Sequence, residues 1–447
     1  MLTRHGLLVP GTPELKKELT VRPVENALGL QSPSFKVYRP ITGTPNVAVP
    51  RYYGTSTRDR RRDPVVCPGL NFIGKLRTET RQPEAFDAGI RAFESIGGGV
   101  LSLPCGYGKT TVALALSARL KVRTMIVVHK EFLANQWVEK IKHFCPGASI
   151  GRVQGDVFDI EKDFVIGMIQ TLCQREFTTE SFDSFGFLIV DEAHHIGAPA
   201  FSQFMFKMCP KYTLGLTATP ERKDGLTRVL YWFLGPEFFR VERVDKRTRV
   251  TTLKYSHDTF KESPPVTRFG KLNMAAMITI LTEIEERNTL ITETALGALR
   301  DGRRVLILSD RREHCFELHR RLGTETSALY IGGMKEAELE ESSKAPIVIG
   351  TFQLAQEGLD IPELDTVILS TPKSDIKQSI GRIMREDPTK TNERAPLIFD
   401  ILDQWSVLFS MYRKRCVVYR EGGFETETAV PEEEPPVFGK GRCLFSS

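Results

Sequence analysis

The feature that most constrains the fold is an apolar segment that leads through a glycine-rich turn into a helix-forming segment. Gly99–Leu103 reads Gly-Val-Leu-Ser-Leu, the turn continues Pro-Cys-Gly-Tyr-Gly-Lys-Thr-Thr, and Val112–Ala118 is rich in alanine and leucine. A glycine turn between a strand and a helix lets backbone N–H groups close around a phosphate at the helix N-terminus. The order of these segments predicts a parallel α/β domain with a phosphate-binding loop.

The residues of this turn match the phosphate loop of nucleotide-binding proteins, in which each residue type has its own task. Gly106 and Gly108 allow a close backbone approach, Lys109 reaches the β- and γ-phosphates, and Thr110 offers its hydroxyl to Mg²⁺. We therefore expect ATP to contact Pro104, Cys105, Gly106, Tyr107, Gly108, Lys109, Thr110 and Thr111. Leu103 stands where the strict pattern has glycine, and the alternative is an ordinary turn before a surface helix.

A second chemical motif follows another apolar run. Phe187–Val190 leads directly into Asp191, Glu192, Ala193 and His194, which predicts a buried strand that delivers two acids at its carboxyl end. We expect Asp191 to hold Mg²⁺ and Glu192 to orient the attacking water, because phosphoryl transfer depends on positioning and charge stabilisation. The alternative is an acid pair in a surface loop.

A third motif lies nearly two hundred residues further on, in Gln378–Arg385. Arg382 and Arg385 fall almost one turn apart on one face of an expected helix that also carries Gln378. Planar guanidinium groups placed there could meet the charge that develops on a transferred phosphoryl group. A salt-bridged surface helix would give a similar pattern. With the first two motifs, however, the arginines complete the parts that ATP hydrolysis requires.

With these motifs in this order, the chain resembles the helicases and translocases of superfamily 2. Leu103–Thr111, Asp191–His194, Thr217–Thr219 and Gln378–Arg385 resemble motifs I, II, III and VI of that superfamily. Leu214–Arg222 and the DEAH box, with the second histidine His195, are most similar to the XPB/UvsW-like group. Closer still are helicases of large DNA viruses of eukaryotes, which share segments like Leu103–Gly106 and Val127–Phe132. The resemblance covers roughly residues 70 to 405. It implies two tandem RecA-like domains that use ATP and Mg²⁺ and bind nucleic acid.

The resemblance also assigns roles to residues that carry no strong signal of their own. Gln82 would read the adenine, and Gly358 and Asp360 would face the nucleotide from the second domain. The residues that would contact nucleic acid or couple it to hydrolysis are His129, Lys130, Gln170, Thr171, His194, Thr217, Thr219, Thr351 and Gln378. Several of these residues stand at strand ends, where they could equally be caps or turn residues, and the loop around Gly358 is one residue longer than in common relatives.

Length and alternating patterns give the expected domain plan. With 447 residues, the chain is long enough for two parallel-sheet domains and two appendages. The fold class is α/β, with a small N-terminal module and an acidic C-terminal tail. The expected ranges are 1–70 for a basic N-terminal module, 71–235 for the ATP-binding domain, 236–285 for a hinge, 286–410 for the helicase C-terminal domain, and 411–447 for a partly disordered tail.

Positive charge is concentrated at the N-terminus. Residues 1–80 hold 13 Lys and Arg against 6 Asp and Glu, net +7, whereas the whole chain is net +5. The run Arg58–Arg62 could bind phosphates or act as a nuclear-import signal. It could equally be a solvated linker whose charges keep it soluble. Short apolar runs at Phe35–Tyr38 and Val47–Val49 predict strands in this module.

The tail and the cysteines exclude other classes. Residues after Glu421 include Glu432–Pro436 and show no apolar periodicity, which indicates disorder or a partner-docking tail. The eight cysteines include no Cys-x-x-Cys pair, so neither a zinc knuckle nor a disulfide framework is indicated. No apolar run approaches 18 residues and no signal peptide opens the chain. We expect a soluble intracellular protein, or, if viral, one of the host cytoplasm, the nucleus or the virion.

Together these patterns predict an ATP-dependent helicase or translocase, most simply one acting on DNA. Two alternatives remain open, namely a double-stranded-DNA translocase that does not separate strands in viral transcription, and an RNA helicase. Transcription or replication machinery could dock on the N-terminal module or the tail, and no membrane partner is expected. The sequence does not decide between DNA and RNA, the polarity, or the cellular role.

Overall fold

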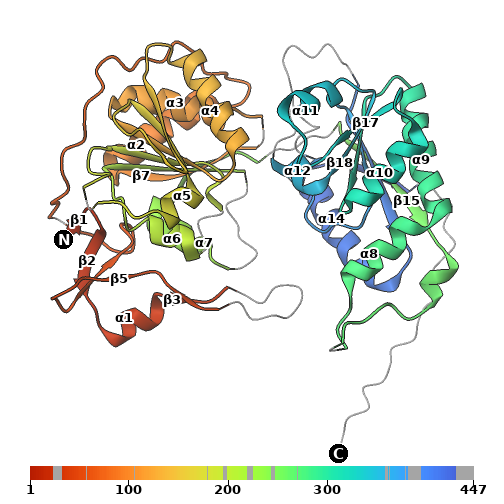
Figure 1. Cartoon of the computed structure of the whole chain (residues 1–447), viewed down its shortest axis with the longest axis horizontal. Helices are drawn as coiled ribbons and strands as arrows, with labels where there is room; N and C mark the ends of the chain where they lie inside the picture. Colours follow the sequence, from red (N-terminus) through yellow and green to blue (C-terminus); the bar gives the residue numbers. More distant parts are fainter. Residues whose placement is uncertain are drawn as a thin grey trace, which may run out of the picture. The chain divides into compact units, whose positions relative to one another are not determined.

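The computed structural model divides into two compact units, Met1–Arg243 and Val244–Ser447 (Figure 1). It describes residues 1–23, 33–56, 58–104, 106–178, 180–194, 199–218, 225–242, 247–268, 270–357, 361, 363–377, 379–380 and 394–428. No helix in this described part is long and apolar enough to cross a membrane.

The first unit is built on an eight-stranded sheet in which all neighbouring strands are parallel except the β10–β9 pair. In spatial order the strands are β10 (Val157–Phe158), β9 (Ile150–Gln154), β11 (Phe164–Met168), β8 (Thr124–Val128), β12 (Phe187–Val190), β13 (Tyr212–Thr217), β7 (Gly98–Ser102) and β14 (Glu237–Arg240). The strands β7, β8, β11 and β12 are buried at every position, as parallel strands covered on both faces must be.

Helices cover both faces of this sheet, and each face has its own apolar core (Figure 1). One face carries α2 (Gln82–Ser95), α3 (Lys109–Leu120) and α4 (Glu131–Phe144), and the other carries α5 (Ile169–Gln174), α6 (Pro199–Phe204) and α7 (Thr227–Leu234). Trp137 of α4 and Leu114 of α3 belong to the first core, whereas Phe204 of α6 and Leu230 of α7 belong to the second. The sheet is thus closed to water between two helical layers.

The N-terminal residues form a small β-rich module that shares the second core. Its strands are β1 (Leu2–Thr3), β2 (Gly6–Pro10), β3 (Thr20–Val21), β4 (Phe35–Lys36), β5 (Arg39–Pro40) and β6 (Asn46–Val49), with α1 (Pro13–Glu18) between β2 and β3. An antiparallel sheet has the order β1-β2-β6-β5, and β3 pairs with β4. Leu7 and Val47 pack in the same cluster as Phe206 and Phe233. The module therefore continues the core of the first unit.

Residues 51–73 run from this module along the amino ends of the central strands. The Arg51 guanidinium donates to the carbonyl oxygens of Pro210 and Ile96, which lie just before β13 and β7. The backbone N–H of Val65 donates to the carbonyl of Ser184, just before β12. We call this segment the strap. Because parallel strands begin at one edge of a sheet, the strap covers the amino edge.

The second unit has a seven-stranded sheet that is parallel throughout. In spatial order its strands are β17 (Ser327–Tyr330), β18 (Ile347–Thr351), β16 (Val305–Ser309), β19 (Thr366–Leu369), β20 (Leu397–Asp403), β15 (Arg249–Tyr255) and β21 (Glu425–Thr428). Residues of α9 (Glu285–Arg300) and α10 (Arg312–Leu322) form the core on one face. Residues of α12 (Phe352–Glu357) and α14 (Phe409–Glu421) contribute to the core on the other. The described part of this unit also contains α8 (Met274–Glu283) and α11 (Glu336–Ser342).

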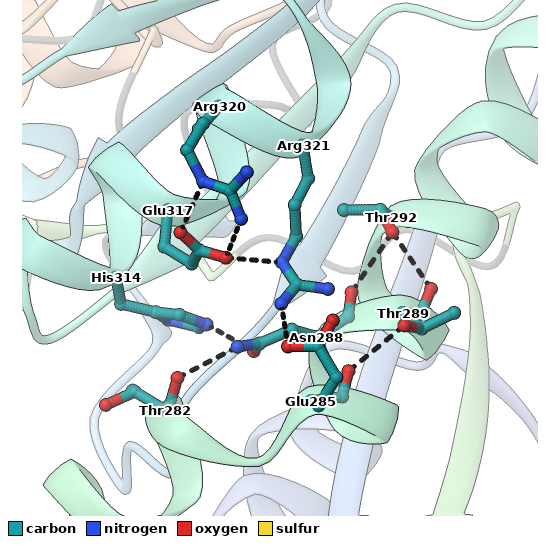
Figure 2. A network of polar contacts seen from close by, with 9 residues as sticks. All are labelled: Thr282, Glu285, Asn288, Thr289, Thr292, His314, Glu317, Arg320 and Arg321. Atoms are coloured by element: carbon teal, nitrogen blue, oxygen red, sulfur yellow. Dashed lines mark hydrogen bonds and ion pairs between the residues drawn. The ribbon is translucent and has the colours of Figure 1, made fainter.

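Polar contacts tie α9 to α10 at the surface of this unit, as Figure 2 shows. Glu317 accepts hydrogen bonds from Arg320 and Arg321, and Arg321 also pairs with Glu285 of α9. These arginines lower the pKa of Glu317 to about 2. Deeper in the same network, the ring of His314 meets the Asn288 side chain at 2.9 Å. The two helices are therefore joined by both exposed and buried polar contacts.

The fold class expected from the sequence is confirmed, since both units are parallel α/β sheets consistent with RecA-like domains. The structure differs from the expected ranges in two places. Residues 236–285, expected as a hinge, contribute β14 to the first sheet and β15 and α8 to the second unit. Residues 411–447, expected as a tail, include most of α14 and the strand β21, which pairs with β15.

Candidate functional site

The candidate site of the first unit lies at the carboxyl ends of its strands, where the phosphate loop and the acid pair both begin. Seven of the residues expected to act there or in the second unit lie outside the described residues. They are Cys105, Thr219, Gly358, Asp360, Gln378, Arg382 and Arg385. Their roles remain predictions.

The phosphate loop links β7 to α3 with two glycines in a left-handed conformation. Gly106 and Gly108 have φ values of 83° and 80°, which residues with a Cβ adopt only with strain. A Cβ added to Gly108 would lie 2.3 Å from the side-chain nitrogen of Gln82. The backbone N–H of Leu103 donates to the carbonyl of Thr217 at 3.1 Å, which anchors the loop to β13. Pro104 and Tyr107 are half-buried in this turn.

Gln82 is buried against the phosphate loop and holds its shape. Its side-chain amide donates to the carbonyl of Tyr107 at 3.0 Å and accepts from the backbone N–H of Arg77 at 3.0 Å. The Arg77 guanidinium donates to the carbonyl of Gly106, also at 3.0 Å. Arg77, which precedes α2, and Gln82, its first residue, thus fix two carbonyls of the loop. The expected role of Gln82 in reading adenine remains a prediction.

Lys109 begins α3 and turns back over the loop. Its ammonium donates to the carbonyl of Leu103 at 3.0 Å, so the cation lies at the mouth of the glycine turn. Thr110 and Thr111 follow in the first turn of α3, both half-buried. The N-cap of this helix is Gly108, which makes no side-chain cap. Backbone N–H groups at such an end are suited to an anion.

Asp191 follows the last residue of β12 and is held by two donors. Its Oδ2 accepts from the indole N–H of Trp137 at 2.9 Å, and its Oδ1 accepts from the backbone N–H of Glu192 at 3.0 Å. Loss of water contact, and secondly the negative charge of Glu192, raise the pKa of Asp191 to about 6. The Trp137 hydrogen bond and the positive charge of Lys109 oppose this rise. A cation close to the carboxylate would lower this raised pKa.

Glu192 is held in a left-handed conformation, with a φ of 48°. Such a residue costs on the order of 1–2 kcal/mol and is found most often where function requires a particular side-chain direction. Its Oε2 lies 3.4 Å from Nδ1 of His194, and that nitrogen lies 3.3 Å from the hydroxyl of Thr217. The acid pair is thereby connected to the end of β13.

The four residues expected to contact nucleic acid in the first unit also lie at strand ends. His129 and Lys130 follow β8, and burial lowers the pKa of both side chains. Gln170 is exposed at the start of α5 and donates to the carbonyl of His129 at 2.8 Å. The hydroxyl of Thr171 accepts from the backbone N–H of Gly155 at 3.0 Å. His129 and Gln170 thus form one connected edge, with Thr171 bonded to the turn after β9.

In the second unit, Thr351 ends β18 and lies opposite Ser309 of β16. At the same carboxyl edge, the ammonium of Lys373 pairs with Asp310 at 2.8 Å. The backbone N–H of Asp310 donates to the hydroxyl of Thr371 at 2.8 Å. The segment that leads toward residue 378 is therefore tied to the loop after β16.

The residues of the first unit fit a nucleotide and a hydrated divalent cation. The absence of a Cβ at Gly108 lets Gln82 pack against the glycine turn, a lysine lies at the mouth of the turn, and the charge of that lysine acts on the carboxylate of Asp191. Mg²⁺ keeps several waters and is held by one or two carboxylates together with phosphates, so Asp191 and Thr110 suffice as protein ligands. Among the described residues, no group of three or more His, Cys, Asp and Glu could hold a metal ion by itself.

Two contacts at this site were not expected from the sequence. The sequence does not indicate the contact between Arg77 and the phosphate loop, because a single arginine before a helix is usually a surface residue. Trp137 occupies an apolar position of α4 and is 2% exposed, so its periodicity indicates only a core residue. Neither contact can be inferred until the packing of α2 and α4 is known.

Each unit of the chain matches a known protein family. Residues 75–222 match the family described as "Type III restriction enzyme, res subunit". Residues 286–387 match "Helicase conserved C-terminal domain". The first match includes the phosphate loop and the acid pair, and the second covers half of the second unit.

Individual relatives extend over most of the chain. It is 33% identical to a putative ATP-dependent RNA helicase of Acanthamoeba polyphaga mimivirus, over 87% of this chain and 78% of the relative. It is 27% identical to a putative helicase of Invertebrate iridescent virus 6, over 72% of this chain and 76% of the relative. The fold is similar to the ATP-dependent Type ISP restriction-modification enzyme LlaBIII bound to DNA, with a TM-score of 0.57, 16% identity, and coverage of 81% and 32% of the two chains.

The match to the mimivirus helicase over 87% of this chain and the two domain matches agree with the family that the motifs resemble. The chain is an ATP-dependent enzyme that binds nucleic acid. It belongs to the superfamily 2 helicases found in large DNA viruses.

Proposed function

We propose that this helicase acts on DNA and hydrolyses ATP with Mg²⁺ between its two RecA-like domains. The observation that carries the proposal is the grouping of Lys109, Asp191 and Glu192 at one edge of the first sheet. A cation for phosphates, a carboxylate for a metal and a second acid for water are the parts that phosphoryl transfer to water needs.

Each residue has a distinct part in the proposed reaction. Lys109 and Thr110 bind the phosphates and the metal, Asp191 holds the metal through water, and Glu192 orients the attacking water. The left-handed backbone of Glu192 supports this role, because such strain is concentrated at functional sites. When bound, Mg²⁺ would neutralise charge on the β- and γ-phosphates.

The second domain would supply Arg382 and Arg385 to the same phosphates. Without ATP and nucleic acid together, these guanidinium groups would stay away from the reacting atoms, so turnover would depend on both ligands. Replacing Arg385 by Ala should then slow hydrolysis on the order of 10³-fold while ATP binding persists. An unchanged rate would remove the arginine from the mechanism.

The choice of DNA rests on the first domain, which matches a restriction-enzyme subunit family over its whole nucleotide site. A specific observation favours RNA as the second candidate, since the mimivirus relative is named a putative RNA helicase. Strand-end hydroxyls, amides and cations such as Lys130 and Gln170 suit phosphate contacts, which do not distinguish the two polymers.

The deciding experiment measures the ATPase rate while matched DNA and RNA oligonucleotides are titrated. DNA of one sequence, single- and double-stranded, should stimulate hydrolysis more than RNA of the same sequence. Stimulation by duplex DNA without strand separation in a parallel unwinding assay would identify a translocase. Stimulation by RNA alone would contradict the DNA assignment. The Lys109→Ala variant serves as the control that no contaminating ATPase is measured.

A further inference from the structure

Trp137 of α4 is buried beside the carboxylate that the proposed function gives to the metal. Its side chain is 2% exposed, and its indole N–H donates to Oδ2 of Asp191 at 2.9 Å. An indole nitrogen can donate one hydrogen bond and accept none. The contact therefore has a fixed direction. Hydrogen bonds to an ionised carboxylate are about twice as strong as neutral ones.

The two donors on Asp191 orient its carboxylate and leave lone pairs for other ligands. Oδ2 accepts from Trp137 and Oδ1 accepts from the backbone N–H of Glu192. Because each oxygen has one donor, the plane of the carboxylate cannot rotate without breaking a contact. A carboxylate offers about four lone-pair positions, so about two remain for metal-bound water.

The helix that carries Trp137 begins at the edge expected to contact nucleic acid. His129 and Lys130 immediately precede α4, which starts at Glu131. The His129 carbonyl is fixed by the side chain of Gln170 at 2.8 Å. Trp137 lies less than two turns into the same helix. A shift of the helix N-terminus would therefore move the indole relative to β12.

We propose that Trp137 is a positioning residue that orients Asp191 for its metal and makes that orientation depend on nucleic acid bound at the start of α4. This inference rests on the proposed function, because it takes Asp191 as the metal ligand. Nucleic acid that shifts or steadies α4 changes the hydrogen bond from Trp137, and thereby the affinity of the site for the hydrated cation. The helix provides a direct physical link between the two ligands.

The competing explanation is that Trp137 is only a core residue whose buried N–H needs an acceptor. Replacing Trp137 by Phe keeps an aromatic ring and removes the donor, so the variant separates the two explanations. Trp405 offers a matched control in the second unit. It is also 2% exposed, and within the described part of the chain its indole nitrogen has no hydrogen-bond partner. Trp405→Phe therefore removes ring volume without removing a hydrogen bond.

The experiment measures Mn²⁺ binding to the full chain by electron paramagnetic resonance of the free ion, in the presence of a non-hydrolysable ATP analogue. Trp137→Phe should weaken Mn²⁺ binding by about 10-fold or more, as loss of outer-shell contacts to metal ligands usually does. A single-stranded oligonucleotide should tighten Mn²⁺ binding in the wild type and have no such effect in Trp137→Phe. Binding of the analogue without metal should stay at the wild-type value, and Trp405→Phe should match the wild type throughout.

Wild-type Mn²⁺ affinity in Trp137→Phe would overturn the inference and leave the proposed function standing. If the wild type itself binds no Mn²⁺ with the analogue, the proposed metal site fails and the inference fails with it. A second measurement does not require a variant at Trp137. Trp232→Phe and Trp405→Phe together leave Trp137 as the remaining tryptophan. In that variant the fluorescence emission of Trp137 should change when Mg²⁺ is added to the nucleotide-bound protein. Unchanged emission would also overturn the inference.

Discussion

Breaking the buried ion pair between Arg287 and Asp403 by removing one partner should strongly destabilise the second unit. Both side chains are fully buried, and Nε and Nη2 of Arg287 donate to the two carboxylate oxygens at 2.7 Å and 2.9 Å. A third donor, Nη1, bonds the carbonyl of Ser370 at 2.8 Å, just after β19. Asp403→Asn keeps the shape of the side chain but leaves the guanidinium charge without its counterion. Leaving one partner of a buried pair uncompensated costs about 3–5 kcal/mol.

This cost corresponds to roughly two to nearly four orders of magnitude in the folding equilibrium. The assay is unfolding in urea, and hydrogen exchange in peptides from β20 and α9 monitors the local unfolding of the second unit. A local probe is needed because the two units can unfold separately, so a global midpoint would average them. Glu341→Gln is the matched control, because it breaks an ion pair with Lys344 at the surface. The Glu341 side chain is 77% exposed and the Lys344 side chain is 62% exposed. That control should change stability by less than about 1 kcal/mol.

The double variant Arg287→Met, Asp403→Leu tests the electrostatic reasoning directly. Removing both charges together should be much less harmful than removing either one, because no buried charge is left unpaired. A loss of under about 1 kcal/mol in Asp403→Asn would refute the argument. So would a double variant that is less stable than both single variants.

Three further outcomes are expected. Burial lowers the pKa of His314 from 6.5 to about 3, so below pH 6.5 the unfolded chain gains a proton that the folded unit does not. The second unit should then lose about 1.4 kcal/mol per pH unit between those values, and His314→Gln should flatten this slope in acid unfolding. Gly108→Ala should weaken ATP binding by more than about 10-fold, because strain at a φ of 80° adds to a 2.3 Å clash with Gln82. Gly147→Ala, with open space around its Cβ, is the control in the same nucleotide titration. Glu192→Gln should bind ATP and metal normally yet hydrolyse slowly and release nucleic acid late, and a wild-type ATPase rate would count against its role.

The strands that could be predicted are those made of continuous apolar residues. Phe187–Val190 was expected as a buried strand at the bounds that the structure gives to β12. The strands β16 and β18 have similar apolar sequences, Val-Leu-Ile-Leu-Ser and Ile-Val-Ile-Gly-Thr. Strands buried between two helical layers need apolar residues at every position, which makes them visible without periodicity. The phosphate loop could also be located from the sequence, because the strand before its glycine turn is buried at every position and a helix-forming segment follows the turn.

Strands with polar buried positions could not be predicted in this way. The strand β15 reads Arg-Val-Thr-Thr-Leu-Lys-Tyr, and it lies between β20 and β21. Its buried hydroxyls are satisfied by distant residues, since Thr252 meets the Tyr412 hydroxyl at 3.0 Å and Thr251 donates to Glu427 at 2.8 Å. Partners more than 150 residues away leave no trace in a local pattern. The polar sequence of β21 was therefore interpreted as part of a tail.

The contacts of the strap account for part of the positive charge near the N-terminus. Arg61 pairs with Asp59 and donates to the carbonyl of Pro210, while Arg62 lies 3.4 Å from Asp183. These contacts lie beside the start of β13, whereas the phosphate loop and the acid pair lie at the opposite, carboxyl edge of the same sheet. Both guanidinium groups thus fasten the strap to the amino edge of the first sheet. These structural contacts were expected neither from a solvated linker nor from a phosphate-binding run, and they direct the search for nucleic-acid contacts to the edge formed by His129 and Gln170.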